Sequence, residues 1–167
     1  ALPGDPAFTA RFVAGVSNPS QFDATALRLD HRWTDKLNSF FRFSISPSST
    51  RSFVFANGVN SQETNLWTYT GGLTWTVRPS VANDFRFNYS RTAGEFDFRG
   101  REIGGAVLPS DDVFFPAGFD RAVTSVGWNL IAQGSFVTSV TQGRSLGNQQ
   151  RQFNLVDNLT WIVGRHQ

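Results

Sequence analysis

The chain has 167 residues, and its 15 basic and 13 acidic residues leave a formal net charge of only +2. It contains no cysteine and no methionine, which excludes a disulfide framework and a cysteine-based metal cluster. Aromatic residues make up 14% of the chain, with 17 Phe and 5 Trp, so the predicted elements have to account for an unusual amount of ring surface.

Residues 1–21 precede the first predicted strand. The segment opens Ala1-Leu2-Pro3-Gly4 and has no basic start followed by an apolar core, so it does not have the pattern of a signal peptide. We interpret residues 1–21 as the end of an outer loop.

The first predicted strand begins at Leu27, where apolar and polar residues start to alternate. Leu27, Leu29 and Trp33 fall on one face, and Arg28, Asp30 and Arg32 fall on the other. A strand that crosses a membrane in a barrel needs this period of two for about 9 to 11 residues, with one face toward lipid and one toward the lumen. The segment has that pattern.

Four further segments alternate in the same way along the chain. The predicted lipid-facing residues of all five segments are Leu27, Leu29, Trp33, Phe41, Phe43, Ile45, Trp67, Tyr69, Leu73, Trp75, Phe85, Phe87, Tyr89, Phe153, Leu155, Leu159 and Trp161. The predicted lumen-facing polar residues are Arg28, Asp30, Arg32, Arg42, Asp84, Arg86, Asn88, Asn154 and Asn158.

Three residues depart from the alternation. Phe40 interrupts the polar face of the second segment, while Asn83 and Asp157 have the parity of the lipid-facing residues. Asn83 lies near a turn, where water is close. A carboxylate inside a bilayer costs free energy, so Asp157 requires protonation, an interfacial position, a bulge or coverage by another part of the protein.

Short and long connections are expected to alternate. Thr34-Asp35-Lys36 and Arg78-Pro79-Ser80 are tight turns, whereas Pro47, which lacks an N–H, is expected to end the second strand and to begin a long loop at residues 47–62. A second long segment covers residues 93–149. Outer-membrane barrels have short periplasmic turns and long extracellular loops, so residues 150–167 are expected to be a strand followed by a periplasmic turn that begins at Gly164.

These patterns predict an all-β fold: an antiparallel transmembrane β-barrel segment of about five to seven strands, with residues 22–92 forming four of them. A closed barrel of this kind has at least 8 strands, so we expect the chain to be part of a larger barrel in the bacterial outer membrane. Four Trp residues near strand ends are the expected aromatic girdle: Trp33, Trp67, Trp75 and Trp161.

Arginine supplies almost all of the positive charge, because Lys36 is the only lysine. This face carries both signs of charge, which predicts cross-strand pairing of guanidinium and carboxylate groups; its charged residues are Arg28, Arg32, Arg42, Arg86, Asp30 and Asp84. We favour this structural role over a ligand site. Nucleic-acid binding is not expected, because the aromatic residues lie on the opposite face from the arginines.

The long segment of residues 93–149 is the expected place for ligand specificity. Residues 123–128 and 130–141 are interpreted as a β-excursion or as strand extensions. The ligand-loop candidates are Asp111, Asp112, Phe114, Phe115, Phe119 and Trp128. The two acids, with Glu102, are either a calcium site or solvated loop charge, and solvation is favoured. The rings either stack on a sugar or peptide or pack within the loop, and packing is favoured.

Sequence motifs for catalysis and cofactor binding are absent from the chain. It has no GxGxxG, no Walker-type loop and no HExxH, and His31 and His166 are too distant in sequence to indicate a local metal site. We therefore predict no enzyme activity, no cofactor and no metal. The competing class is a soluble or secreted β-sandwich that binds carbohydrate or protein through its loops, with strands of about five or six residues.

Three runs resemble a known family: LRLDHRWTDKLNSFFRFSISPSST from Leu27 to Thr50, NDFRFNYSR from Asn83 to Arg91, and QRQFNLVDNLTWIVGRHQ from Gln150 to Gln167. They are similar to the barrel domain of Oar-like TonB-dependent outer-membrane receptors of the acidobacterial type. The resemblance implies a barrel of about 22 strands, a plug inside it, and uptake of a nutrient ligand driven by the TonB complex. Neither a plug nor a TonB box nor the family's terminal aromatic strand is visible in this sequence.

Overall fold

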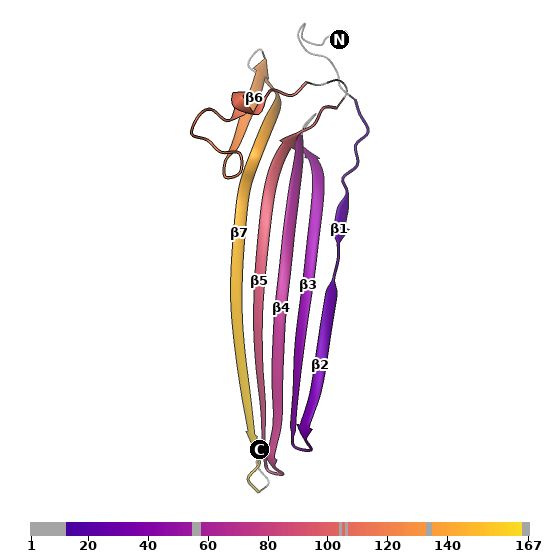
Figure 1. The fold of residues 1–167 in the computed structure, drawn as a ribbon, viewed down its shortest axis with the longest axis vertical. Coiled ribbons are helices and arrows are strands. Elements are labelled where there is room, and N and C mark those ends of the chain that lie inside the picture. The colour runs from indigo at the N-terminus through magenta and orange to yellow at the C-terminus, as the bar shows by residue number, and fades with distance from the viewer. Residues whose placement is uncertain (1–12, 55–57, 104, 106, 133–134, 165–167) are drawn as a thin grey trace. The chain divides into compact units, whose positions relative to one another are not determined.

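The computed structural model describes residues 13–54, 58–103, 105, 107–132 and 135–164. These residues form one sheet of seven strands and one short helix, α1 (Asp111–Phe114), as Figure 1 shows. The predicted all-β class is confirmed, and seven strands lie within the expected range. The strands are β1 (Ser20–Phe22), β2 (Thr25–Thr34), β3 (Leu37–Val54), β4 (Gly58–Arg78), β5 (Val81–Gly100), β6 (Ser125–Ala132) and β7 (Ser135–Trp161).

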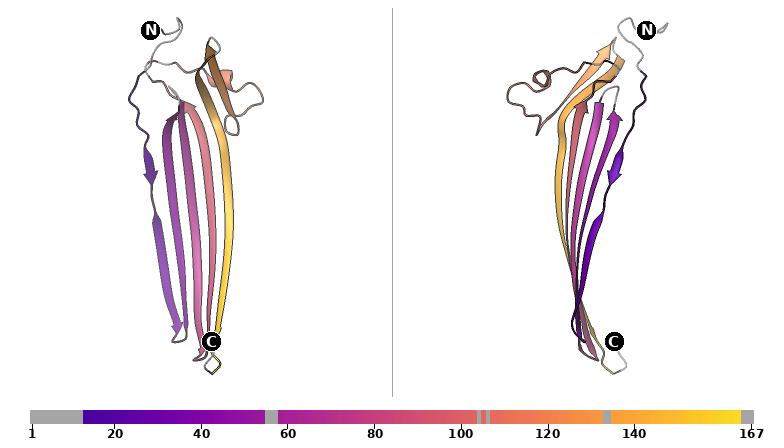
Figure 2. Two further views of the ribbon diagram at one scale, coloured as in Figure 1. Left: turned by 180° about the vertical axis from the view of Figure 1, so that it is seen from behind. Right: turned by 45° about the vertical axis from the view of Figure 1, so that its right-hand side comes forward.

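The sheet order is β1-β3-β4-β5-β7-β6, with β2 also paired to β3. Both views in Figure 2 show the long strands lying side by side. The path has two ends, so the sheet formed by the described residues is open. In the same residues no helix is long and apolar enough to cross a membrane.

The contacts of the chain divide it into two compact units, which are described separately. The wall unit comprises residues 22–48, 64–94 and 148–167, and the loop unit comprises residues 1–21, 49–63 and 95–147. Both units therefore contain parts of the same long strands.

In the wall unit, the two predicted tight turns are confirmed. Asp35-Lys36 joins β2 to β3, and Pro79-Ser80 joins β4 to β5. Both turns lie at the same end of this unit (Figure 1). At the third expected turn, Gly164 adopts a φ of 62°, which favours glycine, while Arg165 and His166 lie outside the described residues.

The pairing of β2 with β3 shows how the alternation is used. Leu27 faces Phe43 and Leu29 faces Phe41, whereas Arg28 faces Arg42. Residues of odd number thus share one face and residues of even number share the other. We call these the odd face and the even face of the long strands.

The expectation that β3 ends at Pro47 is wrong, because β3 continues to Val54. Pro47 lies opposite the interruption between β1 and β2, where its carbonyl accepts a hydrogen bond from the Asp23 N–H at 3.0 Å. The hydrogen bond that Pro47 cannot donate would therefore go to a short edge strand, and a sheet tolerates proline at such a position. With β4 beginning at Gly58, the expected loop of residues 47–62 is largely strand.

The loop unit also contains more strand than expected for residues 93–149. β5 continues to Gly100, and β6 pairs with β7 from Ser125 opposite Gly143 to Ala132 opposite Ser135. Of residues 123–128 and 130–141, the expected β-excursion or strand extensions, part forms the separate strand β6 and part forms the beginning of β7. Gly143 has a φ of 99°, and a side chain there would overlap the carbonyl of Thr124, so glycine is required at this point of β7.

Burial differs sharply between the two units. No described residue of the wall unit is buried, and Leu155 is 71% exposed. The two buried apolar side chains of the described residues, Val59 and Phe114, both belong to the loop unit. A sheet with apolar residues on one face and nothing packed against it needs another apolar medium to cover that face.

Candidate functional site

An aromatic row crosses four strands on the odd face of the wall unit. The ring centroids of Phe43 and Tyr69 lie 5.1 Å apart, those of Tyr69 and Tyr89 lie 6.0 Å apart, and those of Tyr89 and Phe153 lie 4.6 Å apart. These separations are typical of attractive ring pairs. The aromatic row therefore ties β3, β4, β5 and β7 together at one level of the sheet.

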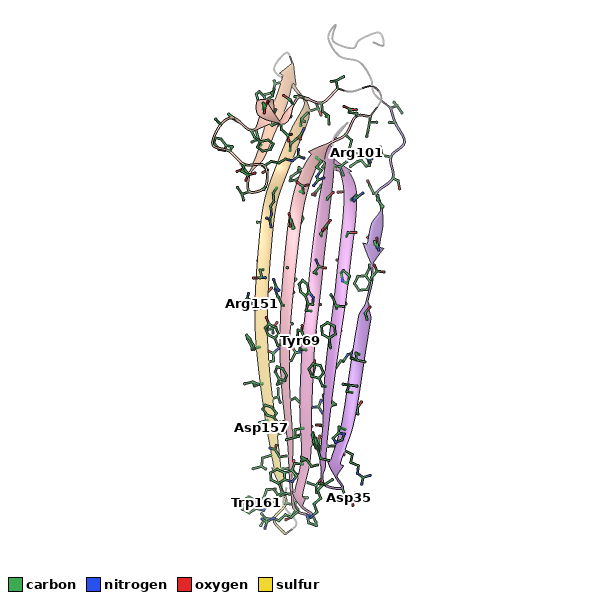
Figure 3. All side chains as sticks on the ribbon, viewed as in Figure 1. Asp35, Tyr69, Arg101, Arg151, Asp157 and Trp161 are labelled. Atoms are coloured by element: carbon green, nitrogen blue, oxygen red, sulfur yellow. The ribbon has the colours of Figure 1, made fainter. Side chains whose placement is uncertain are left out.

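A second group of rings lies near the tight turns. The Trp33 indole N–H donates to the hydroxyl of Ser39 at 2.9 Å, and its ring meets His31 edge-on at 4.3 Å. Trp161 and Asp35 lie at this same end of the wall unit (Figure 3). Indole rings with a satisfied N–H and a largely exposed body suit a boundary between apolar and aqueous surroundings.

Charged groups on the even face of the wall unit are paired along single strands. Arg28 donates to both carboxylate oxygens of Asp30 at 2.8 and 2.7 Å, and Arg86 donates to those of Asp84 at 3.2 and 3.0 Å. The predicted cross-strand pairing is therefore wrong. The register explains the difference, because Arg28 faces another arginine, Arg42, across β2 and β3.

The remaining lumen candidates have varied surroundings. Arg32 forms its ion pair with Asp35 of the turn at 2.6 Å. Asn88 donates to the Thr70 hydroxyl at 2.9 Å. Arg42 is exposed and has no carboxylate partner among the described residues. The even face of the wall unit thus presents exposed charge and hydrogen-bonding groups.

Phe40 interrupts the polar face because it fills a gap in the neighbouring strand. A side chain at Gly72 of β4 would overlap the Phe40 ring. The guanidinium of Arg28 covers the same ring, 4.4 Å from its centroid. Phe40 therefore packs on bare backbone and carries a cation above it, an arrangement in which an aromatic ring compensates for a glycine.

The two polar residues of odd parity bind each other. The Asn83 amide N–H donates to a carboxylate oxygen of Asp157 at 2.7 Å, although 74 positions separate them in sequence. Figure 3 shows Asp157 on β7 between the levels of Tyr69 and Trp161. The hydrogen bond gives Asp157 a partner on the odd face, where its strand neighbours Leu155 and Leu159 offer none.

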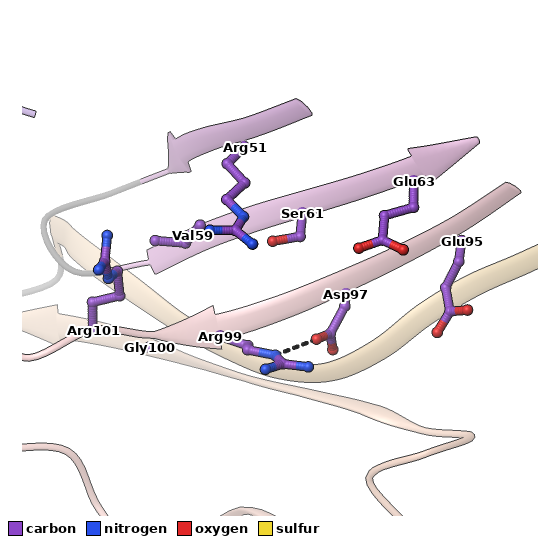
Figure 4. A pocket seen from close by; sticks show the side chains of 9 residues that line it. All are labelled: Arg51, Val59, Ser61, Glu63, Glu95, Asp97, Arg99, Gly100 and Arg101. Atoms are coloured by element: carbon purple, nitrogen blue, oxygen red, sulfur yellow. Dashed lines mark hydrogen bonds and ion pairs between the residues drawn. The ribbon is translucent and has the colours of Figure 1, made fainter. Parts of the chain in front are cut away.

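A charged hollow of about 520 Å³ lies in the loop unit (Figure 4). Residues of β3, β4 and β5 line it together with Arg101, which follows β5, and all its charged members have odd numbers. The charged lining residues are Arg51, Glu63, Glu95, Asp97, Arg99 and Arg101. Arg99 is ion-paired with Asp97, and Arg144 approaches Glu95 to 3.3 Å.

A second hollow of about 440 Å³ in the loop unit shares Arg51 and Arg101 with the first. The Arg101 guanidinium lies 6.0 Å from the ring centroid of Phe53. Sequence reasoning missed these residues. The signal was present as charges at positions 95, 97, 99 and 101 in the run EFDFRGR, which alternates like a strand but places charge on the odd face.

A family model described as outer membrane beta barrel domain matches residues 1–167. The chain belongs to this family. The domain is accordingly a membrane β-barrel domain of the bacterial outer membrane, and the competing β-sandwich is excluded. No curated protein and no solved structure shows significant similarity to the chain.

The ligand-loop candidates of this barrel domain are divided between packing and exposure. Phe114 is only 3% exposed and contacts the rings of Phe115 and Trp128, with centroids 6.5 and 6.3 Å away. Phe119 is largely exposed. Asp111 accepts two hydrogen bonds from Arg121 at 2.9 and 3.0 Å. Phe114 thus anchors the loop, while the Phe119 side chain is open to solvent.

Nothing in the described part of the barrel domain forms a metal centre, since no three His, Asp or Glu side chains gather there. Asp112 and Glu102 are exposed. The family to which the domain belongs is typically structural or transporting rather than catalytic. The chemistry that its side chains offer is binding, through guanidinium and carboxylate groups in the charged hollow and through polar groups on the even face.

Proposed function

We propose that this barrel domain is a wall segment of an Oar-like TonB-dependent receptor that takes up a nutrient across the outer membrane. The observation that carries the proposal is the exposed charge on the even face of the wall unit, where Arg28–Asp30 and Arg86–Asp84 pair in the open. Side chains fill the interior of a barrel of about eight strands, whereas large barrels enclose a channel or a plugged lumen. Two ion pairs on the even face suit the second kind, because an aqueous lumen solvates charge.

We propose that the odd face meets lipid. On β4 its apolar residues extend from Trp67 to Val77, which spans roughly 33 Å of strand at about 3.3 Å per residue. With the usual tilt of about 40°, this corresponds to a height of roughly 25 Å, the height of the apolar band of outer-membrane barrels. Outer-membrane lipid is therefore the partner proposed for this face.

Three further partners follow from the proposed class of receptor. The even face would surround a plug, the plug would engage the TonB complex, and the unknown nutrient would first meet the loops. The charged hollow of the loop unit, with three arginines and three acids, favours a polar or charged nutrient over an apolar one.

Single cysteines test the assignment of the two faces, because the chain has none of its own. Cysteine is placed at Phe85, Arg86, Phe87 and Asn88 in the protein in outer membranes and is labelled with an apolar and a water-soluble maleimide. Positions 85 and 87 should react with the apolar reagent, and positions 86 and 88 with the aqueous one. Uniform aqueous labelling would contradict the proposed faces.

Photo-crosslinking tests the receptor class without knowledge of the nutrient. A photoreactive phenylalanine at Asn88 on the even face should crosslink to a plug segment of the same polypeptide, identified by mass spectrometry. The matched control at Phe87 on the odd face should yield lipid adducts only. If position 88 gives no protein crosslink in cells with or without TonB, the proposed plugged receptor is wrong.

A further inference from the structure

Two arginines lie directly beyond the aromatic row on the odd face of the wall unit. Arg91 comes two residues after Tyr89 on β5, and Arg151 comes two residues before Phe153 on the neighbouring strand β7. The rings of Tyr89 and Phe153 are in contact at 4.6 Å. The Ile162 N–H donates to the Ser80 carbonyl at 2.9 Å, and an antiparallel register continued from this pair matches Tyr89 with Phe153 and Arg91 with Arg151.

Neither arginine has a carboxylate partner among the described residues. The Arg91 guanidinium lies 5.1 Å from the centroid of the Trp67 ring, and its Nε is buried without an acceptor. Within the described ranges, the side-chain hydrogen bond of Arg151 is the one that it donates to the Gln149 side-chain oxygen, at 3.3 Å. Arg28 and Arg86 on the even face, in contrast, each hold an aspartate.

The acids of the same unit do not supply the missing counter-charge. On β5 and β7 of the wall unit, the described carboxylate on the odd face is Asp157, which lies on the other side of Phe153 and is bonded by Asn83. Like charges directly opposite each other destabilise a sheet, and burying a charge without an acceptor costs more beside an apolar band. An anion between the two guanidinium groups would remove both costs.

We propose that Arg91 and Arg151 bind a phosphate group of lipid A in the outer leaflet of the outer membrane. Two guanidinium groups offer forked pairs of N–H donors that match phosphate oxygens. The aromatic row next to them would pack against the acyl chains of the same lipid. This inference rests on the proposed orientation, in which the tight turns near Asp35 are periplasmic and Arg151 lies toward the cell exterior (Figure 3).

The depth of Arg91 and Arg151 in the membrane decides which membrane phosphates they can reach. In the proposed orientation Trp67, whose ring lies beneath the Arg91 guanidinium, marks the outer boundary of the apolar band on β4, and the phosphates of lipid A lie at that boundary. A phospholipid phosphate of the inner leaflet would lie at the opposite end, near Trp161. The chemistry is the same in both cases, so the test has to compare the two lipids.

The test uses the purified full-length protein in detergent, with native mass spectrometry to count bound lipid. The probes are lipid A with two phosphates, monophosphoryl lipid A and phosphatidylglycerol. The wild type should retain doubly phosphorylated lipid A best. Each basic residue near an anionic membrane surface contributes a similar share of the binding free energy. Arg91→Gln with Arg151→Gln should therefore weaken the binding of doubly phosphorylated lipid A about 30-fold.

Two controls keep the outcome interpretable. Arg42→Gln with Arg86→Gln removes the same charge from the even face and should leave lipid A binding unchanged. Arg91→Lys with Arg151→Lys keeps the charge and should retain most of the lipid A binding. If the double glutamine variant does not insert, Arg151→Gln alone suffices, because the Arg151 side chain is exposed.

Unchanged lipid A binding in the glutamine variants would overturn the site, as would an equal loss in the Arg42 and Arg86 control. A loss of phosphatidylglycerol binding without a loss of lipid A binding would overturn the choice of leaflet. None of these results depends on nutrient uptake or on a plug crosslink, so failure of the lipid site and failure of the proposed receptor class can be told apart.

Discussion

The wall unit and the loop unit contain parts of the same strands but differ in the chemistry of the odd face. On β4 the wall unit places Trp67, Tyr69 and Leu73 there, whereas the loop unit places Ser61 and Glu63. The backbone ladder continues through both kinds of sequence. The comparison teaches that backbone hydrogen bonds stabilise the strand in both units, while the side chains of the odd face match lipid in the wall unit and water in the loop unit.

The two units also differ in what covers their apolar side chains. The loop unit buries two apolar side chains, Val59 and Phe114. The described wall unit buries no side chain and has most of its apolar residues on the odd face. Burial of apolar side chains within the chain stabilises the loop unit in water, whereas the wall unit depends on lipid and on neighbouring strands.

The largest expected effect on stability comes from replacing a leucine of β7 by arginine, and the cost should differ between the wall unit and the loop unit. Leu155→Arg in the wall unit should destabilise the inserted protein by about 2 to 4 kcal/mol, the cost of arginine on a lipid face. Leu146→Arg in the loop unit should change stability by less than about 0.5 kcal/mol, as at ordinary exposed sites. Urea unfolding in lipid vesicles measures both, and equal costs would remove the distinction between the units.

A methyl group at a glycine should also separate the units. Gly72→Ala forces the Phe40 ring to move and to lose the cation above it, which should cost about 2 kcal/mol, within the usual range for overpacking. In Gly127→Ala on β6 the new methyl group meets only the Thr141 side chain, whose hydroxyl is the nearest atom at 3.1 Å, so this substitution should cost clearly less. The same unfolding assay checks this, and adding Phe40→Ala should relieve the Gly72→Ala penalty.

The Asn83–Asp157 hydrogen bond sharpens the contrast at a smaller scale. A double-mutant cycle with Asn83→Ala and Asp157→Ala should give a coupling free energy of about 1 kcal/mol, the size found for hydrogen bonds between side chains in membranes. Unfolding of the four proteins in vesicles supplies the values. A coupling of zero would show that water, not lipid, surrounds this part of the odd face.

The smallest effect is expected for an ion pair of the loop unit. Arg121→Ala removes the two contacts to Asp111, both of which are partly exposed. An exposed pair contributes little and is screened by salt. Hydrogen exchange of residues 108–124 should accelerate about twofold at low salt and less at high salt. A much larger acceleration would mean that the pair holds the loop together.

The wall was predictable from sequence wherever the two faces differ. Leu27 to Trp33 and Trp67 to Val77 alternate cleanly, and the turns at Asp35 and Pro79 follow from their residues. The strand beyond Pro47 was missed because a proline is compatible with a strand when it faces a gap at the edge. The rest of β5 was missed because Glu95, Asp97 and Arg99 replace the apolar residues on which the period had been recognised.

The site residues follow the same division. Parity alone groups the residues of the odd face, but the partner of Asp157 could not be named, since 74 positions lie between it and Asn83. The register between β5 and β7 depends on the intervening excursion, which no local pattern determines. Arg51 of the charged hollow could not be named, because it forms no local pattern and lies near Arg99 and Arg101 only through strand pairing.

The contact between Phe40 and Gly72 also bears on how the wall reaches one alignment. A slip of β3 along β4 by two residues keeps each side chain on its face, and lipid would accept the shifted apolar residues of the odd face. The contacts within the sheet would not, since the Phe40 ring would meet Thr70 or Thr74 instead of Gly72, and Phe43 would lose its contact with the Tyr69 ring. The packing of Phe40 on Gly72 and the ring pair of Phe43 and Tyr69 therefore fix the register of two strands whose apolar pattern repeats at every second residue.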